Sequence, residues 1–341
     1  MMIDQRKKKI LFILLGCGVA GLILAAGVFM YLNSSPLADG EEFLFEIQRG
    51  AGFYQVAEEL SRKGAIRSLR FFKQLGKMRN VSHRIKAGYY TIDSSMTANQ
   101  LIDLFVAGRV YTVRITIPEG LHNRQLAERL YRHELIADIE SFIKTASDGS
   151  LLARAGLPAQ STTEGFLFPD TYHIPWGSSE EDIILMMVRN FRNQVGEAML
   201  QQMKESSIGF YNTVIMASIV ERESRLPAEF PKVAGVFYNR LRVNMKFESC
   251  ATIQYILGEV REVLNRGEIF IDDPYNTYQN AGFPPGPICN PGLSAIRAAV
   301  QPAQHDYLFF VSRNDGSHHF SRTGAEHNRA AHRYQWSRQG N

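Results

Sequence analysis

The sequence predicts an α+β protein that one N-terminal transmembrane helix attaches to a membrane. An uncharged apolar run covers residues 10–32, strand and helix patterns alternate over residues 41–110, and further strands and helices are predicted over residues 111–341. With 341 residues, of which 45% are hydrophobic, the chain is long enough for about two folded domains. We expect a small α+β module followed by a larger α+β domain, without an all-parallel sheet.

The apolar run from Ile10 to Leu32 is the predicted membrane helix. A helix of this length spans the hydrocarbon core of a bilayer, which is roughly 30 Å thick. A cleavable signal peptide has a shorter apolar region and a small-residue cleavage site, which this run does not match. Residues 14–17 resemble a lipoprotein signal, but the chain stays apolar afterwards, so we interpret Cys17 as a residue of the membrane helix.

Basic residues indicate how this helix crosses the membrane. A cluster of Lys and Arg at residues 6–9 precedes the apolar run, and no basic residue follows it before Arg49. Because basic residues are enriched on the cytoplasmic side, we expect residues 1–9 to lie in the cytoplasm. The chain would then cross the cytoplasmic (inner) membrane once, with its folded part in the periplasm or outside the cell.

The charge distribution argues against nucleic-acid binding. The net charge is +4 and the pI is near 8.9, but part of the excess lies in the cluster at residues 6–9. The rest of the chain is nearly balanced and has no dense stripe of Lys and Arg to neutralise phosphates. An extended anionic partner such as a peptidoglycan strand remains compatible with this balance.

Residues 33–40, which are rich in Ser, Pro and Gly, form a predicted tether before the module at residues 41–110. The predicted order in this module is strand, helix, helix, strand, helix, which resembles a LysM-like module, a small fold associated with N-acetylglucosamine polymers. Both sugar binding and a structural role are compatible with this pattern. The best-defined elements are a strand with alternating Phe43, Phe45 and Ile47, a helix from Tyr54 to Gly64, a strand from Ile85 to Ile92, and a helix that starts at the capping box Thr97-Ala-Asn-Gln100 and ends near Gly108.

The larger domain begins with another strand, in which Val113, Ile115 and Ile117 alternate. Pro118-Glu-Gly120 ends this strand before a helix at residues 123–133. Further on, Ser178 and Ser179 can cap a long helix that begins with three acidic residues, Glu180, Glu181 and Asp182, at its positive end.

The helix predicted from Tyr211 to Ser224 carries the main candidate for chemistry. Residues 214–220 are apolar nearly all round, which is typical of a buried helix, and Glu221 follows directly on the face of Val214 and Ala217. A carboxylate in this position is partly desolvated, and desolvation raises its pKa toward the range of a general acid. The alternative is a solvated helix end in which Glu221 pairs with Arg225.

A series of motifs surrounds this glutamate in a fixed order. In these motifs, and in its N-terminal anchor, the chain resembles the YceG-like endolytic murein transglycosylase family over nearly its whole exported part. The motifs are Glu164-Gly-Phe-Leu-Phe-Pro-Asp-Thr-Tyr172, Ala217-Ser-Ile-Val-Glu-Arg-Glu-Ser224, Pro231-Lys-Val-Ala-Gly-Val-Phe-Tyr-Asn-Arg-Leu241, Ala251-Thr-Ile-Gln-Tyr255, Tyr275-Asn-Thr-Tyr278, Gly282-Phe-Pro-Pro-Gly-Pro-Ile288, Asn290-Pro-Gly292, Tyr307-Leu-Phe-Phe-Val311, His319-Phe-Ser321 and Glu326-His-Asn328.

The resemblance implies a membrane-anchored lyase with a LysM-like module at residues 41–110 and a catalytic domain at residues 111–341. It implies cleavage of the N-acetylmuramic acid to N-acetylglucosamine linkage, leaving 1,6-anhydro-muramic acid ends, with Glu221 as the essential acid and base. One carboxylate suffices for this route. Hydrolysis usually needs two carboxylates. Because the chain has further carboxylates, a hydrolytic muramidase remains an alternative. A non-catalytic peptidoglycan-binding scaffold is another. The other carboxylates available for hydrolysis are Glu223, Glu248, Asp170 and Asp272, of which Glu223 points away from Glu221 around the helix.

Aromatic rings that stack on sugars and amides that bond to hydroxyls are concentrated in residues 273–292. This composition suits a loop that lines a groove, and an ordered surface loop without a ligand is the alternative. The candidate substrate-binding residues are Tyr275, Asn276, Tyr278 and Asn290 in this loop, and Gln254 and Asn239 on the helices after Glu221.

Cys250 and Cys289 are the two cysteines outside the anchor. In an oxidising compartment they allow either a disulfide or two free thiols, and we expect them to lie close enough to bridge. Cys250 and Ala251 also stand where many family members carry Asp-Pro, which puts in doubt any role of that carboxylate.

We expect no metal and no cofactor. The histidines near the C-terminus lack the spacing of a helical metal site, and His318 and His319 would point to opposite sides of a strand. The expected partners are peptidoglycan glycan strands and the membrane, with peptidoglycan synthases as further candidates.

Overall fold

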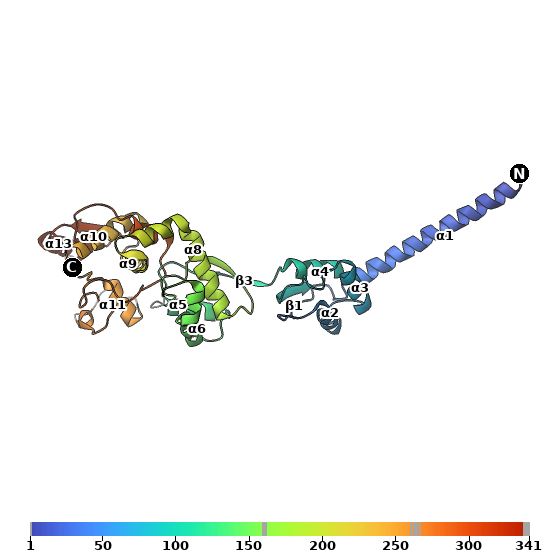
Figure 1. Cartoon of the computed structure of the whole chain (residues 1–341), viewed down its shortest axis with the longest axis horizontal. Coiled ribbons are helices and arrows are strands. Elements are labelled where there is room, and N and C mark those ends of the chain that lie inside the picture. Colours follow the sequence, from blue (N-terminus) through green and yellow to red (C-terminus); the bar gives the residue numbers. More distant parts are fainter. Residues whose placement is uncertain (1, 159–161, 260, 262–264, 266, 337–341) are drawn as a thin grey trace. The chain divides into compact units, whose positions relative to one another are not determined.

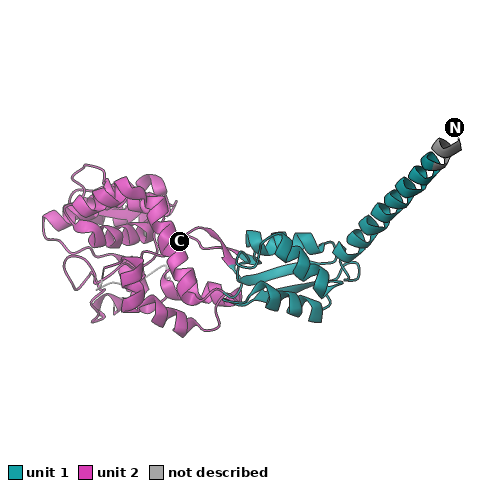
Figure 2. Cartoon of the chain, turned by 45° about the vertical axis from the view of Figure 1, so that its right-hand side comes forward, with its two compact units in different colours: residues 1–113, 175–177 teal, residues 114–174, 178–341 magenta. Residues whose placement is uncertain are grey.

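A computed structural model of the protein describes residues 2–158, 162–259, 261, 265 and 267–336. The chain divides into two compact units, which Figure 2 shows in different colours: residues 1–113 with 175–177, and residues 114–174 with 178–341. Each unit combines helices with short strands. The α+β prediction is therefore confirmed.

The N-terminal helix α1 (Met2–Asn33) contains the predicted anchor (Figure 1). Its stretch from Lys7 to Asn33 is long and apolar enough to cross a membrane, and its large apolar side chains from Ile10 to Tyr31 are exposed. A helix with exposed apolar side chains all round satisfies its backbone hydrogen bonds internally, as a span in lipid requires.

The rest of the first unit contains the predicted strand, helix, helix, strand and helix. Its elements are β1 (Glu42–Ile47), α2 (Phe53–Arg62), α3 (Leu69–Met78), β2 (Gly88–Asp93) and α4 (Ala98–Ala107). The two strands are antiparallel, with Phe45 opposite Tyr90, and these alternating side chains face a core that the three helices cover. The second strand starts later than predicted, because the backbone N–H of Lys86 donates to Phe105 instead of to a neighbouring strand.

The capping box that starts α4 is present as predicted. The Gln100 backbone N–H donates to the Thr97 hydroxyl over 3.3 Å, and the Gln100 side chain accepts from the Thr97 N–H over 2.8 Å. The helix ends at Gly108, whose φ of 69° is the left-handed conformation of a helix terminus.

The second unit contains most of the helices. Its main elements, of which β3 begins and β4 ends within residues assigned to the first unit, are β3 (Thr112–Thr116), α5 (Asn123–Arg132), α6 (Ile139–Ala146), α7 (Gly149–Ala155), β4 (Thr171–Pro175), α8 (Glu180–Glu205), α9 (Gly209–Glu223), α10 (Phe230–Arg242), α11 (Cys250–Leu257), α12 (Leu293–Val300), β5 (Phe309–Ser312), β6 (His318–Ser321) and α13 (Gly324–Ala331). Short helical turns lie at η1 (Pro227–Glu229), η2 (Glu268–Phe270) and η3 (His332–Trp336). β3 pairs with β4, and β5 with β6 in antiparallel fashion.

Helix α9 is the central element of this unit. Every residue from Thr213 to Val220 is buried, because α8, α10, α11 and α12 all pack against this helix. The prediction of a helix buried all round is confirmed. The Ser179 cap of α8 is also present, although Gly196, with a φ of 73°, interrupts that helix. Burial of α9 fixes the position of its last turn, which carries Glu221.

The first unit offers a test of its packing at Gly76 in α3. A Cβ at this position would overlap the ring of Phe53, which stacks on Phe72 in the core. Alanine gains about 1 kcal/mol in helix propensity over glycine, but overpacking a rigid core costs about 1–3 kcal/mol. Gly76→Ala should therefore lower the free energy of unfolding of this unit, measured by urea denaturation. Gly52→Ala, where nothing lies within 4 Å, is the matched control and should change stability little. A stabilised Gly76→Ala variant would contradict the packing described.

Candidate active site

Glu221 lies in the last turn of α9, directly after the buried stretch. One carboxylate oxygen, Oε2, accepts a hydrogen bond of 2.9 Å from the backbone N–H of Gly292. The side chain is partly buried. The carboxyl group is thus held by one directed bond.

Burial raises the pKa of Glu221 to about 7. The hydrogen bond from Gly292 and the guanidinium of Arg222 lower this pKa, while the nearby carboxylate of Glu119 raises it further. The prediction of a partly desolvated carboxylate, rather than a solvated helix end, is confirmed. A group with this pKa exchanges a proton readily at neutral pH.

Three loops around Glu221 are joined by the buried side chain of Asn290. Its Oδ1 accepts from the backbone N–H groups of Gly165 (3.0 Å) and Leu167 (2.9 Å), and its Nδ2 donates to Leu121 O and Asn123 Oδ1, both over 3.1 Å. The backbones of residues 120–121 and 290 are also hydrogen-bonded to each other. Asn290, predicted to bind substrate, therefore uses its amide to hold the loop that presents Gly292.

Glu119 is a second carboxylate near Glu221 that we did not predict. It is exposed in the turn after β3, and its carboxyl group lies against Gly292, where a Cβ would overlap Oε1 and Cδ. In the sequence this residue belongs to Pro118-Glu-Gly120, which predicted only the end of a strand. Nothing in its spacing indicates proximity to Glu221.

Glu164 is a buried carboxyl group in the first motif of the resemblance. Both of its oxygens accept from the backbone N–H of Asn123 at the start of α5, over 3.1 and 3.0 Å. Burial raises the pKa of Glu164 to about 8. Glu164 lies at a cavity of about 480 Å³, which is also lined by Arg124, Tyr255 and Tyr275.

Two tyrosines form an aromatic wall of this cavity. The rings of Tyr255 and Tyr275 are tilted with centroids 4.9 Å apart, and both side chains are only partly buried. A cavity of this size with aromatic walls and polar groups is suited to a sugar or a peptide. Of the predicted substrate-binding residues, the structure places Tyr275 at this cavity.

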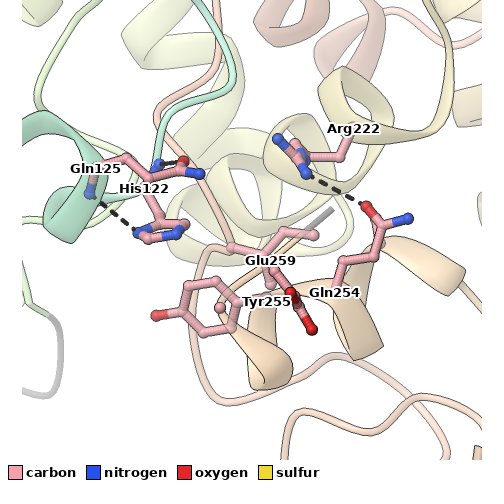
Figure 3. A pocket seen from close by; sticks show the side chains of 9 residues that line it. His122, Gln125, Arg222, Gln254, Tyr255 and Glu259 are labelled. Atoms are coloured by element: carbon pink, nitrogen blue, oxygen red, sulfur yellow. Dashed lines mark hydrogen bonds between the residues drawn. The ribbon is translucent and has the colours of Figure 1, made fainter. Parts of the chain in front are cut away.

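A narrower crevice lies beside the end of α9 (Figure 3). Arg222 donates to the Gln254 side chain over 3.3 Å and to the Gly120 carbonyl over 3.2 Å, while His122 caps α5 through Gln125. Burial lowers the pKa of His122 to about 4, so this imidazole is neutral at pH 7. Gln254, another predicted residue, is therefore near the loop that carries Glu119.

The remaining predicted residues lie elsewhere. The Asn276 amide is buried and donates to Ile269 O and Ile271 O within its own loop. The hydroxyl of Tyr278 lies 3.0 Å from the Cys250 sulfur. Asn239 is buried on α10, donates to the carbonyls of His305 and Tyr307, and lines a separate cavity. The amides of Asn276 and Asn239 thus bond to the protein's own backbone.

The other carboxylates considered for hydrolysis are bonded to different groups. Glu223 accepts from the Ser249 hydroxyl at the start of α11, Glu248 pairs with Arg240 over 3.2 Å, and Asp170 accepts from Asn190 over 2.9 Å. Asp272 is exposed. Glu223 therefore supports α11, in keeping with its predicted direction away from Glu221.

Of the two alternatives for Cys250 and Cys289, a disulfide or two free thiols, the structure has the free thiols. Cys250 and Cys289 are both free thiols, the first exposed and the second buried. Cys289 donates to the Ser218 carbonyl over 3.3 Å, while Cys250 contacts Tyr278. Because the two sulfurs point to different partners, they do not bridge.

In the part of the chain that the structure describes, no group of three or more His, Cys, Asp or Glu side chains is arranged to hold a metal ion. His318 instead bonds to the Glu229 carboxylate over 2.7 Å, which ties β6 to η1.

Comparison with known proteins places this chain in a family. A model of the YceG-like family matches residues 45–333. The chain belongs to the YceG-like family. It is 31% identical to a protein of Bacillus subtilis named endolytic murein transglycosylase, over 92% of this chain and 91% of that protein.

Two further relatives support the assignment. A Streptococcus pneumoniae protein of the same name is 27% identical over 83% of this chain and 56% of its own, longer chain. A crystal structure of a yceG-like protein from Listeria monocytogenes matches with a TM-score of 0.60 and 29% identity, covering 85% of this chain and 98% of that one. The family resemblance predicted from the motifs is confirmed.

Replacing Glu221 should stabilise this YceG-like protein in a pH-dependent way. The folded-state pKa of about 7 lies above the ordinary value of 4.5, so ionisation of Glu221 destabilises the fold as pH rises through this window. Glu221→Gln should raise the free energy of unfolding by about 1–3 kcal/mol at about pH 8 and change it little at about pH 4. Urea denaturation at several pH values measures this, with Glu197→Gln on exposed α8 surface as control. A Glu221→Gln protein less stable than wild type at about pH 8 would contradict the burial described.

Proposed function

We propose that this protein is an endolytic murein transglycosylase in which Glu221 is both the general acid and the general base. Relatives at 27–31% identity bear that enzyme's name, which supports a lytic transglycosylase role. The observation that carries the assignment of Glu221 is its partly buried carboxyl group with a pKa near 7, which accepts a hydrogen bond from the backbone N–H of Gly292.

The proposed reaction proceeds in two proton transfers. Glu221, protonated, gives its proton to the glycosidic oxygen as the bond from C1 of N-acetylmuramic acid to that oxygen breaks. The resulting carboxylate then takes the proton of the C6 hydroxyl while the oxygen of this hydroxyl bonds to C1, which closes the 1,6-anhydro ring. Water is not consumed, and Glu221 returns to its starting form. A pKa near neutrality suits both steps.

The cavity lined by Tyr255 and Tyr275 is the proposed binding site for the glycan strand. Ring faces stack on sugars, and the partly exposed position of Tyr275 supports its predicted role. Gln254, at the neighbouring crevice, and Tyr278 are further candidates for contact with the strand, whereas Asn239, Asn276 and Asn290 are proposed to support loops. The module at residues 41–110 is a candidate for a second, weaker contact with glycan.

A hydrolytic muramidase is the second candidate, because Glu119 supplies a carboxylate beside Glu221. In that reaction one carboxyl group would activate water, and the product would end in a reducing sugar. Two observations favour the anhydro route over hydrolysis. The stronger is the pKa of Glu221, and the weaker is the exposed position of Glu119, which leaves its carboxyl group solvated. The products of digestion separate the two reactions.

Glu221→Gln should abolish strand cleavage without loss of the fold. Glutamine keeps the size of the side chain and can accept the bond from Gly292, but it cannot exchange a proton, so the rate should fall by about 100-fold or more. The assay digests purified, uncrosslinked glycan strands with the full-length protein in detergent and identifies products by mass.

Wild-type protein should make internal cuts whose ends are lighter than reducing ends by one water. Glu197→Gln is the matched control and should cleave normally. Reducing ends would identify a muramidase, and bound but uncut strands would identify a scaffold. Full activity of a folded Glu221→Gln protein would remove Glu221 from the mechanism.

We also propose that the second unit lies outside the cytoplasm, where peptidoglycan is found. The basic cluster at residues 6–9 before α1 supports this orientation. A reporter that is active only outside the cytoplasm should work when fused after Asn341 and fail when fused before Met1. The reverse result would overturn both the orientation and the substrate.

A further inference from the structure

The turn that carries Glu119 is fixed from two sides. The backbone N–H of Gly120 donates to Asn290 O over 3.0 Å, and Arg222 on α9 donates to the Gly120 carbonyl over 3.2 Å. Gly120 itself has a φ of 79°, a left-handed conformation that reverses the chain at this point. The backbone next to Glu119 is therefore anchored both to the loop of Gly292 and to the helix of Glu221.

Gly292 explains why the Glu119 carboxyl group can lie where it does. The φ and ψ of Gly292, −76° and 169°, are accessible to any residue, so its conformation does not require glycine. Space requires it, because a Cβ would overlap Oε1 and Cδ of Glu119. The carboxyl group of Glu119 thus lies where a side chain at position 292 would be.

The same glycine donates its N–H to Glu221 Oε2. One residue therefore contacts two carboxyl groups, Glu221 at its nitrogen and Glu119 at its α-carbon. We propose that Glu119 is a positioning residue for the reaction: held beside the glycine that both carboxyl groups contact, its negative charge adds to burial in keeping Glu221 in the protonated form that the first step requires. This inference rests on the proposed function of Glu221.

Burial is the larger cause of the raised pKa of Glu221, and among the charged groups around this side chain Glu119 is the one that adds to it. Arg222, on the same helix, carries a positive charge that opposes protonation. Cys289, in the loop before Gly292, is buried, which raises the pKa of its thiol well above the ordinary value and keeps it neutral. His122, in the loop after Glu119, is neutral because burial lowers its pKa. Glu119 adds a like charge, which raises the pKa of Glu221.

The test is the pH dependence of kcat/KM for the full-length protein in detergent, cutting uncrosslinked strands between about pH 5 and about pH 9. The alkaline limb reports the free enzyme's essential acid. In Glu119→Gln this limb should move about 0.5–1 pH unit lower, since a like charge at short range is removed. At about pH 8 the rate should then fall about 3- to 10-fold, while at about pH 5 it should stay within about twofold of wild type.

Glu197→Gln, which removes an exposed carboxylate from α8, is the matched control and should leave the limb unmoved. A limb in Glu119→Gln that coincides with wild type, or an equal loss of rate at every pH, would overturn the proposal. The wild-type digest is made first: without anhydro products the proposed function fails, whatever Glu119 does.

Gly292→Ala gives a second, independent test. Its methyl group displaces the Glu119 carboxyl group while the backbone N–H remains for Glu221, so the limb should again move lower. The double variant Glu119→Gln, Gly292→Ala should show no larger shift than either single change, because both remove the same contact. Additive shifts would show that the two residues act separately and would contradict the inference. If Gly292→Ala does not fold, Glu119→Gln alone decides.

Discussion

The buried side chain of Asn290 is the contact on which the candidate active site depends. Its amide bonds to Gly165, Leu167, Leu121 and Asn123, which lie in loops far apart in the sequence. A buried amide that satisfies its donors and acceptor in this way is costly to displace, because each broken bond leaves a polar group desolvated. The loop from residue 290 to residue 292 is thereby rigid, and rigidity is what lets one backbone N–H define the position of Glu221.

A second constraint comes from the burial of α9. Its packing on four helices leaves the last turn no freedom to rotate, so the carboxyl group must stay at the edge of the core. There it loses part of its hydration, which raises its pKa, and gains one hydrogen bond, which lowers the pKa by less, so the pKa lies near neutrality. A residue that first gives and then takes a proton needs both forms at similar free energy, and this position provides that balance without a metal or a cofactor in the proposed chemistry.

Local patterns in the sequence predicted the helices and strands well, but they could not predict contacts between segments that are distant in the sequence. The capping box at Thr97 and the helix carrying Glu221 depend on neighbours within a few turns, and both were predicted close to their observed bounds. The second strand was predicted too early, because a bond from Lys86 to Phe105 is a tertiary contact. Composition also cannot tell an amide that binds a ligand from one that bonds to the protein's own backbone, as those of Asn276 and Asn290 do.

Glu119 is another residue whose tertiary contact could not be predicted, because a Pro-Glu-Gly turn does not indicate that Glu221 lies nearby in the fold. The proposed effect of Glu119 on Glu221 depends on the absence of a side chain at Gly292. In the sequence, a glycine at this position indicates only a turn or a helix cap. The physical reason for glycine there is space for a carboxylate, not backbone freedom. In the proposed mechanism the two acidic groups have different tasks because their environments differ: the partly buried one exchanges the proton, and the solvated one adds a like charge that favours its protonated form.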